Sequence, residues 1–388
     1  MDPLHRLPAI SDLRREARRR IPHFIFEYLD SATGIEDQKR RNAEALNAVQ
    51  FWPEILKGPM TQDLSTRFLG RDYLLPFGIS PVGMSGVMWP GAEKILASEA
   101  KKLGLPYGYS CVATVTPETL APHIGDDAWF QIYMPWNREI RADMLARAKA
   151  AGFRVLVITV DVPVDSTRER QRRANLNLPM KMTPDILWQV ATHPRWALGT
   201  LREGVPSLKF LESYAETVGP RASTAHAGHT IYGQPSWRDV EEMQTMWDGP
   251  VMVKGVQKPD DARRLAEMGV DAIWVSNHSG RQFDGGPASI DCLPAIRDAV
   301  PDAPLIYDSG IGGGLDILRA IALGADFVMM GRAWHYAVAA LGRAGPKHLV
   351  DILTIDMRLN MGQIGAERLD DLAARLVARP LAPGAPSP

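Results

Sequence analysis

The chain has 388 residues, of which 45% are hydrophobic and 23% are charged, a composition typical of a globular protein with a large core. Its formal net charge of -1 at pH 7 gives no reason to expect a nucleic-acid partner. The two cysteines, Cys111 and Cys292, are too few for a disulfide framework and lack metal-ligand spacing, so we expect a reducing compartment and no metal site. The Arg-rich residues 1–20 contain no apolar segment like that of a signal peptide or a membrane helix, which predicts a cytoplasmic protein.

After a helical segment over residues 1–60, eight short apolar runs recur along the chain, and each ends on small or polar residues. Stretches with helical spacing of apolar residues follow most of these runs. Eight strands that alternate with helices predict one α/β domain over residues 1–388, a (β/α)8 TIM barrel with its active site at the C-terminal strand ends. An open doubly wound sheet alternates in the same way, but eight repeats with polar ends favour closure. The predicted strands are 75–80, 107–111, 129–133, 155–160, 251–254, 272–276, 305–307 and 327–330, and the predicted helices include 92–103, 139–150, 259–268, 289–300 and 315–323.

A long loop insertion, residues 166–235, separates the fourth and fifth predicted strands. It contains nine Lys or Arg and five Asp or Glu, an excess of four positive charges. A basic segment with interfacial aromatic and apolar side chains can dock on an anionic membrane surface, so residues 177–215 are a candidate for peripheral contact with the inner face of the membrane. A solvated lid over the active site or an oligomer contact is the alternative. The apolar side chains in question are Trp188, Trp196, Leu198, Leu201 and Phe210.

A histidine and an arginine follow the apolar run 272–276 directly, in the segment Ser276–Asp284. A histidine at the end of a buried strand, with a guanidinium three residues later, places a general base beside an anion clamp. This pair, His278 and Arg281, suits deprotonation of a small carboxylate substrate. Two later strands also end in polar or glycine residues, so we expect further functional groups at the same mouth of the barrel.

The segment 276–284, Ser-Asn-His-x-Gly-Arg-Gln-x-Asp, resembles a motif of the FMN-dependent α-hydroxy acid oxidases and dehydrogenases, a family that includes glycolate oxidase, L-lactate dehydrogenase and mandelate dehydrogenase. The resemblance covers residues 8–375. It implies FMN as cofactor, an (S)-2-hydroxy acid as substrate and a homotetramer. Gly83 stands where oxidases of the family mostly carry Ala, which favours a quinone or another electron acceptor. The alternative is an oxygen-using oxidase or monooxygenase, and a phosphate-binding barrel without catalysis is a third hypothesis.

The resemblance implies roles for several polar residues at predicted strand ends. His278 would take the proton from the substrate, and Asp161 would pair with it and support its charged form. Arg168 and Arg281 would hold the substrate carboxylate, a task that suits planar guanidinium groups because two parallel hydrogen bonds fix the orientation. By composition alone, Asp161 could instead cap a turn and Arg168 could be a solvated loop charge.

Two tyrosines and a lysine complete the implied reaction site. Tyr28 and Tyr133 match family residues whose hydroxyl groups reach the substrate, although either could be a core aromatic by composition alone. Lys254 ends an apolar run, where a buried cation needs an anionic partner, and the resemblance gives that role to the reduced flavin. The candidate catalytic residues are therefore His278, Asp161, Tyr133 and Lys254.

The implied FMN site consists of backbone and side chains at the ends of the same strands. The phosphate would lie on the glycine-rich turn 310–314 and on the segment after the last strand, where barrels of this type often bind phosphate. Most family members carry an arginine where this chain has Gly312, so Arg332 and backbone N–H groups would bind the phosphate with one charge fewer. The full set of candidate cofactor-binding residues is Pro81, Val82, Gly83, Ser110, Gln131, Thr159, Lys254, Ser276, Asp308, Ser309, Gly310, Gly312, Gly331 and Arg332.

Overall fold

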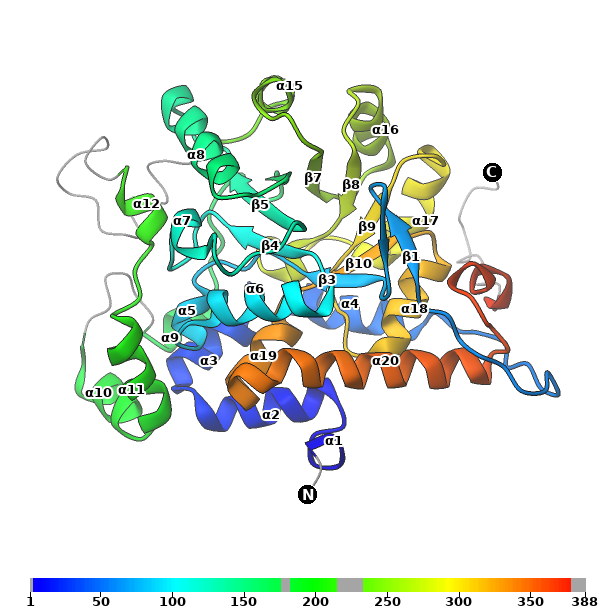
Figure 1. Ribbon diagram of the computed structural model, residues 1–388, viewed down its shortest axis with the longest axis horizontal. Coiled ribbons are helices and arrows are strands. Elements are labelled where there is room, and N and C mark those ends of the chain that lie inside the picture. Colours follow the sequence, from blue (N-terminus) through cyan, green and yellow to red (C-terminus); the bar gives the residue numbers. More distant parts are fainter. Residues whose placement is uncertain (1–2, 176–181, 215–232, 378–388) are drawn as a thin grey trace.

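The computed structural model describes residues 3–175, 182–214 and 233–377, and its centre is a closed barrel of eight parallel strands (Figure 1). The order around the barrel is β10-β3-β4-β5-β6-β7-β8-β9. This closure confirms the predicted (β/α)8 barrel and excludes the open sheet. The strands are β3 (Phe77–Ile79), β4 (Tyr107–Ser110), β5 (Ala128–Tyr133), β6 (Val155–Thr159), β7 (Val251–Val256), β8 (Ala272–Val275), β9 (Leu305–Tyr307) and β10 (Phe327–Met330).

All eight predicted strands are present, and their ends lie within two residues of the predicted ones. Their side chains are buried on both faces, because the barrel interior is filled and helices cover the outside. This explains why the strands occur in the sequence as continuous apolar runs. The covering helices are α6 (Ala92–Leu103), α8 (Arg138–Ala150), α15 (Trp237–Met246), α16 (Pro259–Glu267), α17 (Ser289–Ala299), α18 (Gly314–Ala322), α19 (Arg332–Leu341) and α20 (Gly345–Gln363).

A short antiparallel hairpin, β1 (Thr66–Phe68) and β2 (Arg71–Tyr73), closes the N-terminal end of the barrel. Phe68 and Tyr73 are buried and lie 5.2 Å and 5.0 Å, between ring centroids, from Phe327 at the start of β10. The sequence analysis missed this hairpin because each strand has only three residues. Its position leaves the opposite, C-terminal end of the barrel as the open mouth.

The N-terminal segment is helical only as far as Asn47, so the predicted helical extension to residue 60 is wrong. Pro53, Gly58 and Pro59 interrupt the remaining stretch, and none of them suits a helix interior. The next helix in the chain after this stretch is α5 (Ser85–Met88), which follows β3. The four N-terminal helices are α1 (Pro3–Arg6), α2 (Ile10–Arg20), α3 (His23–Asp30) and α4 (Asp37–Asn47).

The insertion is not the loop that the sequence analysis expected, because its described residues form four short helices. Figure 1 shows two of them, α10 and α11, side by side at the edge of the molecule. The expected exposure holds for Trp188, Leu198 and Leu201 but is wrong for Trp196 and Phe210, which are buried. Of the candidate membrane contact 177–215, residues 177–181 and 215 lie outside the described residues. The helices are α9 (Glu169–Arg173), α10 (Pro184–Ala191), α11 (Pro194–Glu203) and α12 (Lys209–Glu212).

Candidate active site

A cavity of about 1390 Å³ opens at the C-terminal mouth of the barrel. Four candidate residues do not line it, namely Ser110, Gln131, Asp161 and Ser276. Gln131, Asp161 and Ser276 each form a hydrogen bond with a residue that does line it, and Ser110 forms one with Gln131. The structure therefore brings the predicted set to one place. The candidates that line the cavity are Tyr28, Pro81, Val82, Gly83, Tyr133, Thr159, Arg168, Lys254, His278, Arg281, Asp308, Ser309, Gly310, Gly312, Gly331 and Arg332.

The imidazole of His278 is paired with the carboxylate of Asp161, with Nδ1 3.0 Å from Oδ1. Burial alone would raise the pKa of Asp161, but the neighbouring His278, with a further contribution from Lys254, brings that pKa below its usual value. A side chain at Gly255 would come within 2.5 Å of the Asp161 Cβ, and the φ of Gly255 is +108°, so a glycine is required there. The pairing fixes the ring and leaves Nε2 as the nitrogen available to a ligand in the cavity.

Lys254 on β7 has an anionic partner within the protein. Its Nζ lies 2.9 Å from Oδ2 of Asp308 and donates to Oγ of Ser276 at 2.6 Å. Asp308 also accepts a hydrogen bond from the Ser309 hydroxyl at 2.8 Å. The protein thus supplies an anionic partner that the sequence analysis did not identify, and Lys254 also lines the cavity, where a flavin would lie.

Three polar side chains form a row across adjacent strands at the cavity floor. The Ser110 hydroxyl donates to Oε1 of Gln131 at 3.0 Å, and Nε2 of Gln131 donates to Oγ1 of Thr159 at 2.9 Å. Because Thr159 Oγ1 accepts in this row, its own proton points elsewhere and can serve a group in the cavity. Ser110 and Gln131 thus orient Thr159 rather than face the cavity themselves.

Arg168 begins the insertion at the rim of the cavity, immediately before α9. Its Nε donates to Oγ of Ser166 at 3.0 Å and its Nη2 donates to Oε1 of Gln282 at 2.9 Å. Its φ of 42° is in the left-handed region, which is uncommon for a residue other than glycine. These two acceptors orient the guanidinium, but because both are neutral they do not compensate its charge.

Arg281 lines the cavity and contacts the C-terminal end of α3. Its Nη1 donates to the backbone carbonyls of Tyr28, Leu29 and Ser31 at 2.9, 3.4 and 3.1 Å. Burial lowers the pKa of Arg281 to about 9, with the nearby charge of Arg168 as the next cause. The positive charges of Arg168 and Arg281 repel each other, so an anion bound between them would stabilise both charged side chains.

The two candidate tyrosines differ in their surroundings. The Tyr28 hydroxyl donates to the carbonyl of Gly83 at 3.2 Å, which ties α3 to the segment after β3. Tyr133 lines the cavity at the end of β5, and burial, followed by the neighbouring Cys111 and Asp161, raises its pKa above the usual value. The Tyr133 hydroxyl therefore remains protonated at neutral pH and can donate a hydrogen bond.

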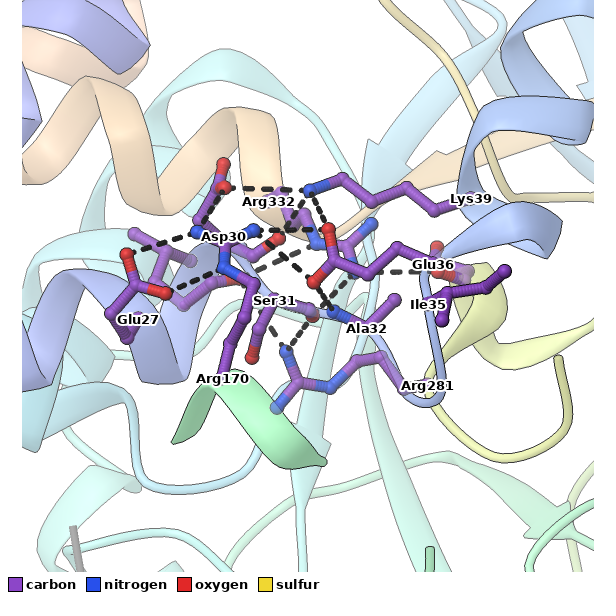
Figure 2. Close-up of polar contacts among 12 residues, drawn as sticks. Glu27, Asp30, Ser31, Ala32, Ile35, Glu36, Lys39, Arg170, Arg281 and Arg332 are labelled. Carbon is purple, nitrogen blue, oxygen red and sulfur yellow. Dashed lines mark hydrogen bonds and ion pairs between the residues drawn. The ribbon is translucent and has the colours of Figure 1, made fainter. Parts of the chain in front are cut away.

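A cluster of charged side chains that the sequence analysis missed holds the rim together (Figure 2). Arg170 on α9 binds Glu27 through Nε and Nη2 at 2.6 and 2.9 Å, Glu36 through Nη1 at 3.0 and 3.1 Å, and Asp30 at 3.1 Å. Lys39 donates to the Asp30 carbonyl at 2.6 Å. The cluster joins the insertion to the N-terminal segment although the two are more than a hundred residues apart in sequence, and no local pattern could have predicted it.

The expected phosphate end of the cavity contains Arg332, at the first position of α19. Its guanidinium donates to the carbonyls of Leu29, Ser31 and Ser279 at 3.3, 2.9 and 3.3 Å. No carboxylate is among these partners, so the charge of Arg332 is available to an anion. The start of α19 adds the positive end of a helix dipole.

The glycine-rich turn offers fewer free N–H groups than the sequence analysis expected. The N–H of Gly312 donates to Oδ2 of Asp316 at 2.8 Å, and the N–H of Gly314 donates to Oδ2 of Asp356 at 2.6 Å. Two carboxylates therefore occupy donors that had been predicted to bind phosphate. Gly310 and Gly312 still line the cavity.

The cavity has features that fit a bound FMN. Ser80 lines the cavity, and its hydroxyl is buried without a hydrogen-bond partner in the described part of the chain, which is the state of a polar group that a ligand would satisfy. A side chain at Gly331 would come within 3.0 Å of Val82, so the backbone there is kept open. Among the described residues there is no cluster of three or more His, Cys, Asp or Glu that could bind a metal ion.

A sequence model of the family described as FMN-dependent dehydrogenase matches residues 17–379. The chain belongs to this family. The predicted family, enzyme class and cofactor are thereby confirmed, because the match extends over the whole barrel and the motif 276–284. Relatives and solved structures agree with this assignment.

Two proteins named L-lactate dehydrogenase are similar to this FMN-dependent dehydrogenase over nearly its whole length. The one from Pseudomonas aeruginosa is 38% identical over 378 residues, covering 97% of this chain and 99% of that protein. The one from Xanthobacter autotrophicus is 38% identical over 379 residues, covering 96% and 97%. Identity at this level across both full lengths shows a shared fold from end to end.

Solved structures give the same result. The crystal structure of (S)-mandelate dehydrogenase, described as a monotopic membrane protein, superposes with a TM-score of 0.90 at 29% identity and covers 95% of this chain and 98% of that one. A lactate oxidase structure described as putative, from Pediococcus acidilactici, has a TM-score of 0.80 at 27% identity and covers 95% and 94%. The family fold thus supports both dehydrogenases and oxidases.

Proposed function

We propose that this FMN-dependent dehydrogenase oxidises an (S)-2-hydroxy carboxylate to the 2-oxo acid. The observation that carries the proposal is the cavity itself. His278, paired with Asp161, faces the same volume as Arg168 and Arg281, which make no ion pair among the described residues. A general base and two guanidinium groups in one cavity suit a substrate that has both a carboxylate and an acidic α-position.

The reaction removes two electrons and two protons from the substrate. Arg168 and Arg281 would bind the carboxylate, and Nε2 of His278 would take a proton from the α-carbon or the hydroxyl. Asp161 would stabilise the resulting imidazolium, because its carboxylate is 3.0 Å from Nδ1. Tyr133 would donate a hydrogen bond to a substrate oxygen. When bound, FMN would accept the two electrons and the second proton, and Lys254 would lie among the residues that contact it.

We propose L-lactate as the first substrate to test and (S)-mandelate as the second. The relatives at 38% identity are named for the former, and a solved structure with a TM-score of 0.90 is named for the latter. Both have the carboxylate and the (S)-2-hydroxyl group that the cavity suits. D-lactate is the matched control, because it differs from L-lactate only in configuration.

A quinone or another membrane-borne acceptor and a peripheral position at the membrane are part of the same proposal. Supporting it are the exposed Trp188 on α10 and Leu198 and Leu201 on α11, together with the likeness to a protein described as monotopic. The described residues include no helix that is long and apolar enough to cross a bilayer. The predicted homotetramer remains a prediction.

Anaerobic reduction of the purified yellow protein tests the proposed reaction. L-lactate or (S)-mandelate should bleach the flavin absorbance while D-lactate does not, and the His278→Gln variant should keep its absorbance but react much more slowly. Initial rates with a soluble quinone and with oxygen then decide the acceptor. Equal bleaching by both lactate enantiomers, or none by any 2-hydroxy acid, would refute the proposed reaction.

A further inference from the structure

A second hollow, of about 260 Å³, lies outside the barrel and apart from the active-site cavity. It is bordered by the start of α6, by α11 of the insertion and by a short 3-10 turn, η2 (Gly342–Ala344). Four of its lining side chains are basic and one is acidic. The residues that matter here are Trp89, Lys94, Arg195, Arg202, Glu203 and Arg343.

Three arginines of this hollow have no ion-pair partner in the part of the chain that the structure describes. Lys94 is paired with Glu203 at 2.8 Å, but Arg195, Arg202 and Arg343 make no ion pair within residues 3–175, 182–214 and 233–377. Three cations from two separate elements thus converge without compensation. All three are exposed, so an external anion can reach them and would offset their mutual repulsion.

Arg20, on α2, lies beside the hollow and strengthens this conclusion. Its guanidinium is 5.0 Å from the centroid of the Trp89 ring, and its Nε is buried without a hydrogen-bond partner in the described part of the chain. Burial lowers the pKa of Arg20, and the charge of Arg195 lowers it further. An arginine held in place with an unfilled donor is a feature of an anion site rather than of a solvated surface.

The helix α11 presents three different faces. Trp196 is buried, and its Nε1 donates to the Val87 carbonyl at 3.0 Å, so this face anchors the helix. Arg195 and Arg202, which are about two helical turns apart, line the hollow. Leu198 and Leu201 project to solvent with exposed fractions of 56% and 74%, about a quarter turn from the arginines at 3.6 residues per turn.

Exposed leucines beside a basic hollow form a surface suited to an anionic membrane. Apolar side chains enter the headgroup region while arginines bind phosphate groups of the lipids. The hollow is smaller than the range of about 300 to 1,000 Å³ typical of sites for drug-sized ligands. It therefore suits a phosphate with a short polar group rather than a nucleotide.

We propose that this hollow binds the phosphate headgroup of an anionic phospholipid, with Arg195, Arg202 and Arg343 as its ligands. The inference deepens the proposed peripheral membrane position and rests on it. Headgroup binding would orient α10 and α11 on the bilayer while the active-site mouth remains a separate opening. Arg20 contributes by holding Trp89 at the edge of the site.

Flotation of the full-length holoenzyme with vesicles tests the proposal. Wild-type protein should float with vesicles that contain phosphatidylglycerol and much less with vesicles of phosphatidylcholine alone. The double variant Arg195→Gln, Arg343→Gln should bind the phosphatidylglycerol vesicles roughly tenfold or more weakly, since each arginine near an anionic surface contributes about fivefold in affinity. Its flavin absorbance and its activity with a soluble acceptor should be unchanged.

The matched control is the double variant Arg67→Gln, Arg154→Gln, which removes the same charge from exposed side chains. If this control lost as much binding as the hollow variant, general electrostatics would explain the attraction and the headgroup site would be refuted. If wild-type protein floated with neither vesicle, the membrane position itself would fail. If inorganic phosphate raised the melting temperature of wild type only and no vesicle bound, the hollow would be a site for free phosphate, which also overturns the lipid assignment.

An independent observation concerns two buried residues at the flavin side of the main cavity. Nε2 of His335, on α19, lies 2.7 Å from Oγ of Ser85, and its Nδ1 lies 2.9 Å from the Gly331 carbonyl. The Ser85 hydroxyl lies 2.9 Å from the Val82 carbonyl. The pair therefore bridges the segments after β3 and β10, which are adjacent strands and which both line the cavity.

The bridge contains three polar contacts but too few protons to fill them. Burial lowers the pKa of His335 to about 4, so the ring is neutral at pH 7 and has one N–H, while Ser85 has one O–H. Both ends of the bridge are carbonyl oxygens, which only accept. Because the 2.7 Å contact between Nε2 and Oγ itself requires a proton, one of the two carbonyls, that of Gly331 or of Val82, lacks a proton from the pair.

We infer that His335 and Ser85 are positioning residues that fix the distance between two backbone segments that would contact FMN. His335→Leu and Ser85→Ala should each weaken FMN binding to the apoprotein by about fivefold or more, as for the loss of one buried hydrogen bond, and should shift the flavin absorbance. The double variant should be no worse than either single one, because both remove the same bridge. This inference does not depend on the identity of the substrate.

A pair of conservative variants separates positioning from general stability. His335→Gln places an amide near Nε2 and should restore the contact with Ser85, whereas His335→Asn reaches only toward Gly331 and should not. FMN titration and the absorbance spectrum are the measurements, with a thermal melt in parallel. A lower melting temperature with unchanged FMN affinity and spectrum in both His335→Leu and Ser85→Ala would refute the role.

Discussion

Arg281 and Arg332 donate hydrogen bonds to the same two backbone carbonyl groups, those of Leu29 and Ser31. For Arg281 the distances are 3.4 and 3.1 Å, and for Arg332 they are 3.3 and 2.9 Å. Arg281 is the candidate substrate ligand and Arg332 the candidate phosphate ligand. The backbone at the C-terminal end of α3 therefore connects the candidate substrate site with the candidate phosphate site.

This sharing predicts that a change at the substrate arginine also affects the cofactor. Arg281→Lys should lower kcat/KM roughly 10- to 150-fold, since a charge-assisted hydrogen bond to a carboxylate is worth about 1.5 to 3 kcal/mol. It should also weaken FMN binding several-fold, because one ammonium group cannot hold the carbonyls that orient Arg332. FMN titration and steady-state kinetics measure both effects.

Arg168→Lys is the control, because Arg168 shares no carbonyl with Arg332 and contacts Ser166 and Gln282 instead. It should reduce kcat/KM while FMN binds normally. Unchanged FMN affinity in Arg281→Lys would mean that the shared carbonyls do not couple the two sites.

The pairing of His278 with Asp161 predicts graded losses. His278→Gln should slow flavin reduction by on the order of 10²-fold or more through loss of the base. Asp161→Asn should slow flavin reduction less. The His278 ring keeps a hydrogen-bond partner in the amide, but the imidazolium loses the carboxylate that stabilises its charge. Both variants should stay yellow. Anaerobic stopped-flow reduction gives the two rates, and near wild-type reduction by His278→Gln would exclude it as the base.

The barrel was predictable from the sequence, because each strand is buried on both faces and therefore forms a continuous apolar run that ends in polar residues. His278 and Arg281 were predictable because they stand directly after such a run. The pairing of Lys254 with Asp308 was not, since residues on β7 and after β9 meet only when the barrel closes. The helices of the insertion were missed because basic and aromatic composition alone does not distinguish a surface loop from short helices that bury Trp196.

Arg170 should stabilise both the fold and the active site. Arg170→Met would leave Glu27, Asp30 and Glu36 without their shared cation, at a cost of about 1.5 to 3 kcal/mol for a partly exposed cluster. Because Arg168 lies two residues away, KM for the hydroxy acid should rise more than kcat falls. Arg173→Met, at an exposed position of the same helix, should change neither. A lower melting temperature with unchanged KM would limit Arg170 to a structural role.

His335 should make the protein sensitive to mild acid. Its pKa falls from 6.5 in the unfolded chain to about 4 in the folded one, so between these values the unfolded chain binds a proton that the folded chain does not. Stability therefore decreases as pH falls through this window, by about 3 kcal/mol in total. His335→Leu should show a smaller loss of melting temperature between pH 6.5 and 4. Parallel curves for the two proteins would contradict the assignment.

Gly312 offers a direct test of the phosphate site. Its φ lies outside the left-handed region, and the atom nearest to a Cβ placed on this residue is Oδ2 of Asp316, at 3.4 Å, so a larger residue should be tolerated. Gly312→Arg should tighten FMN binding about tenfold, because a guanidinium facing a phosphate adds a charge-assisted hydrogen bond of about 1.5 to 3 kcal/mol. Asp316 limits the gain, since it would compete for the new cation. Gly312→Ala adds a side chain without charge and should leave FMN affinity unchanged, so equal titration curves for the two variants would show that residue 312 does not face the phosphate.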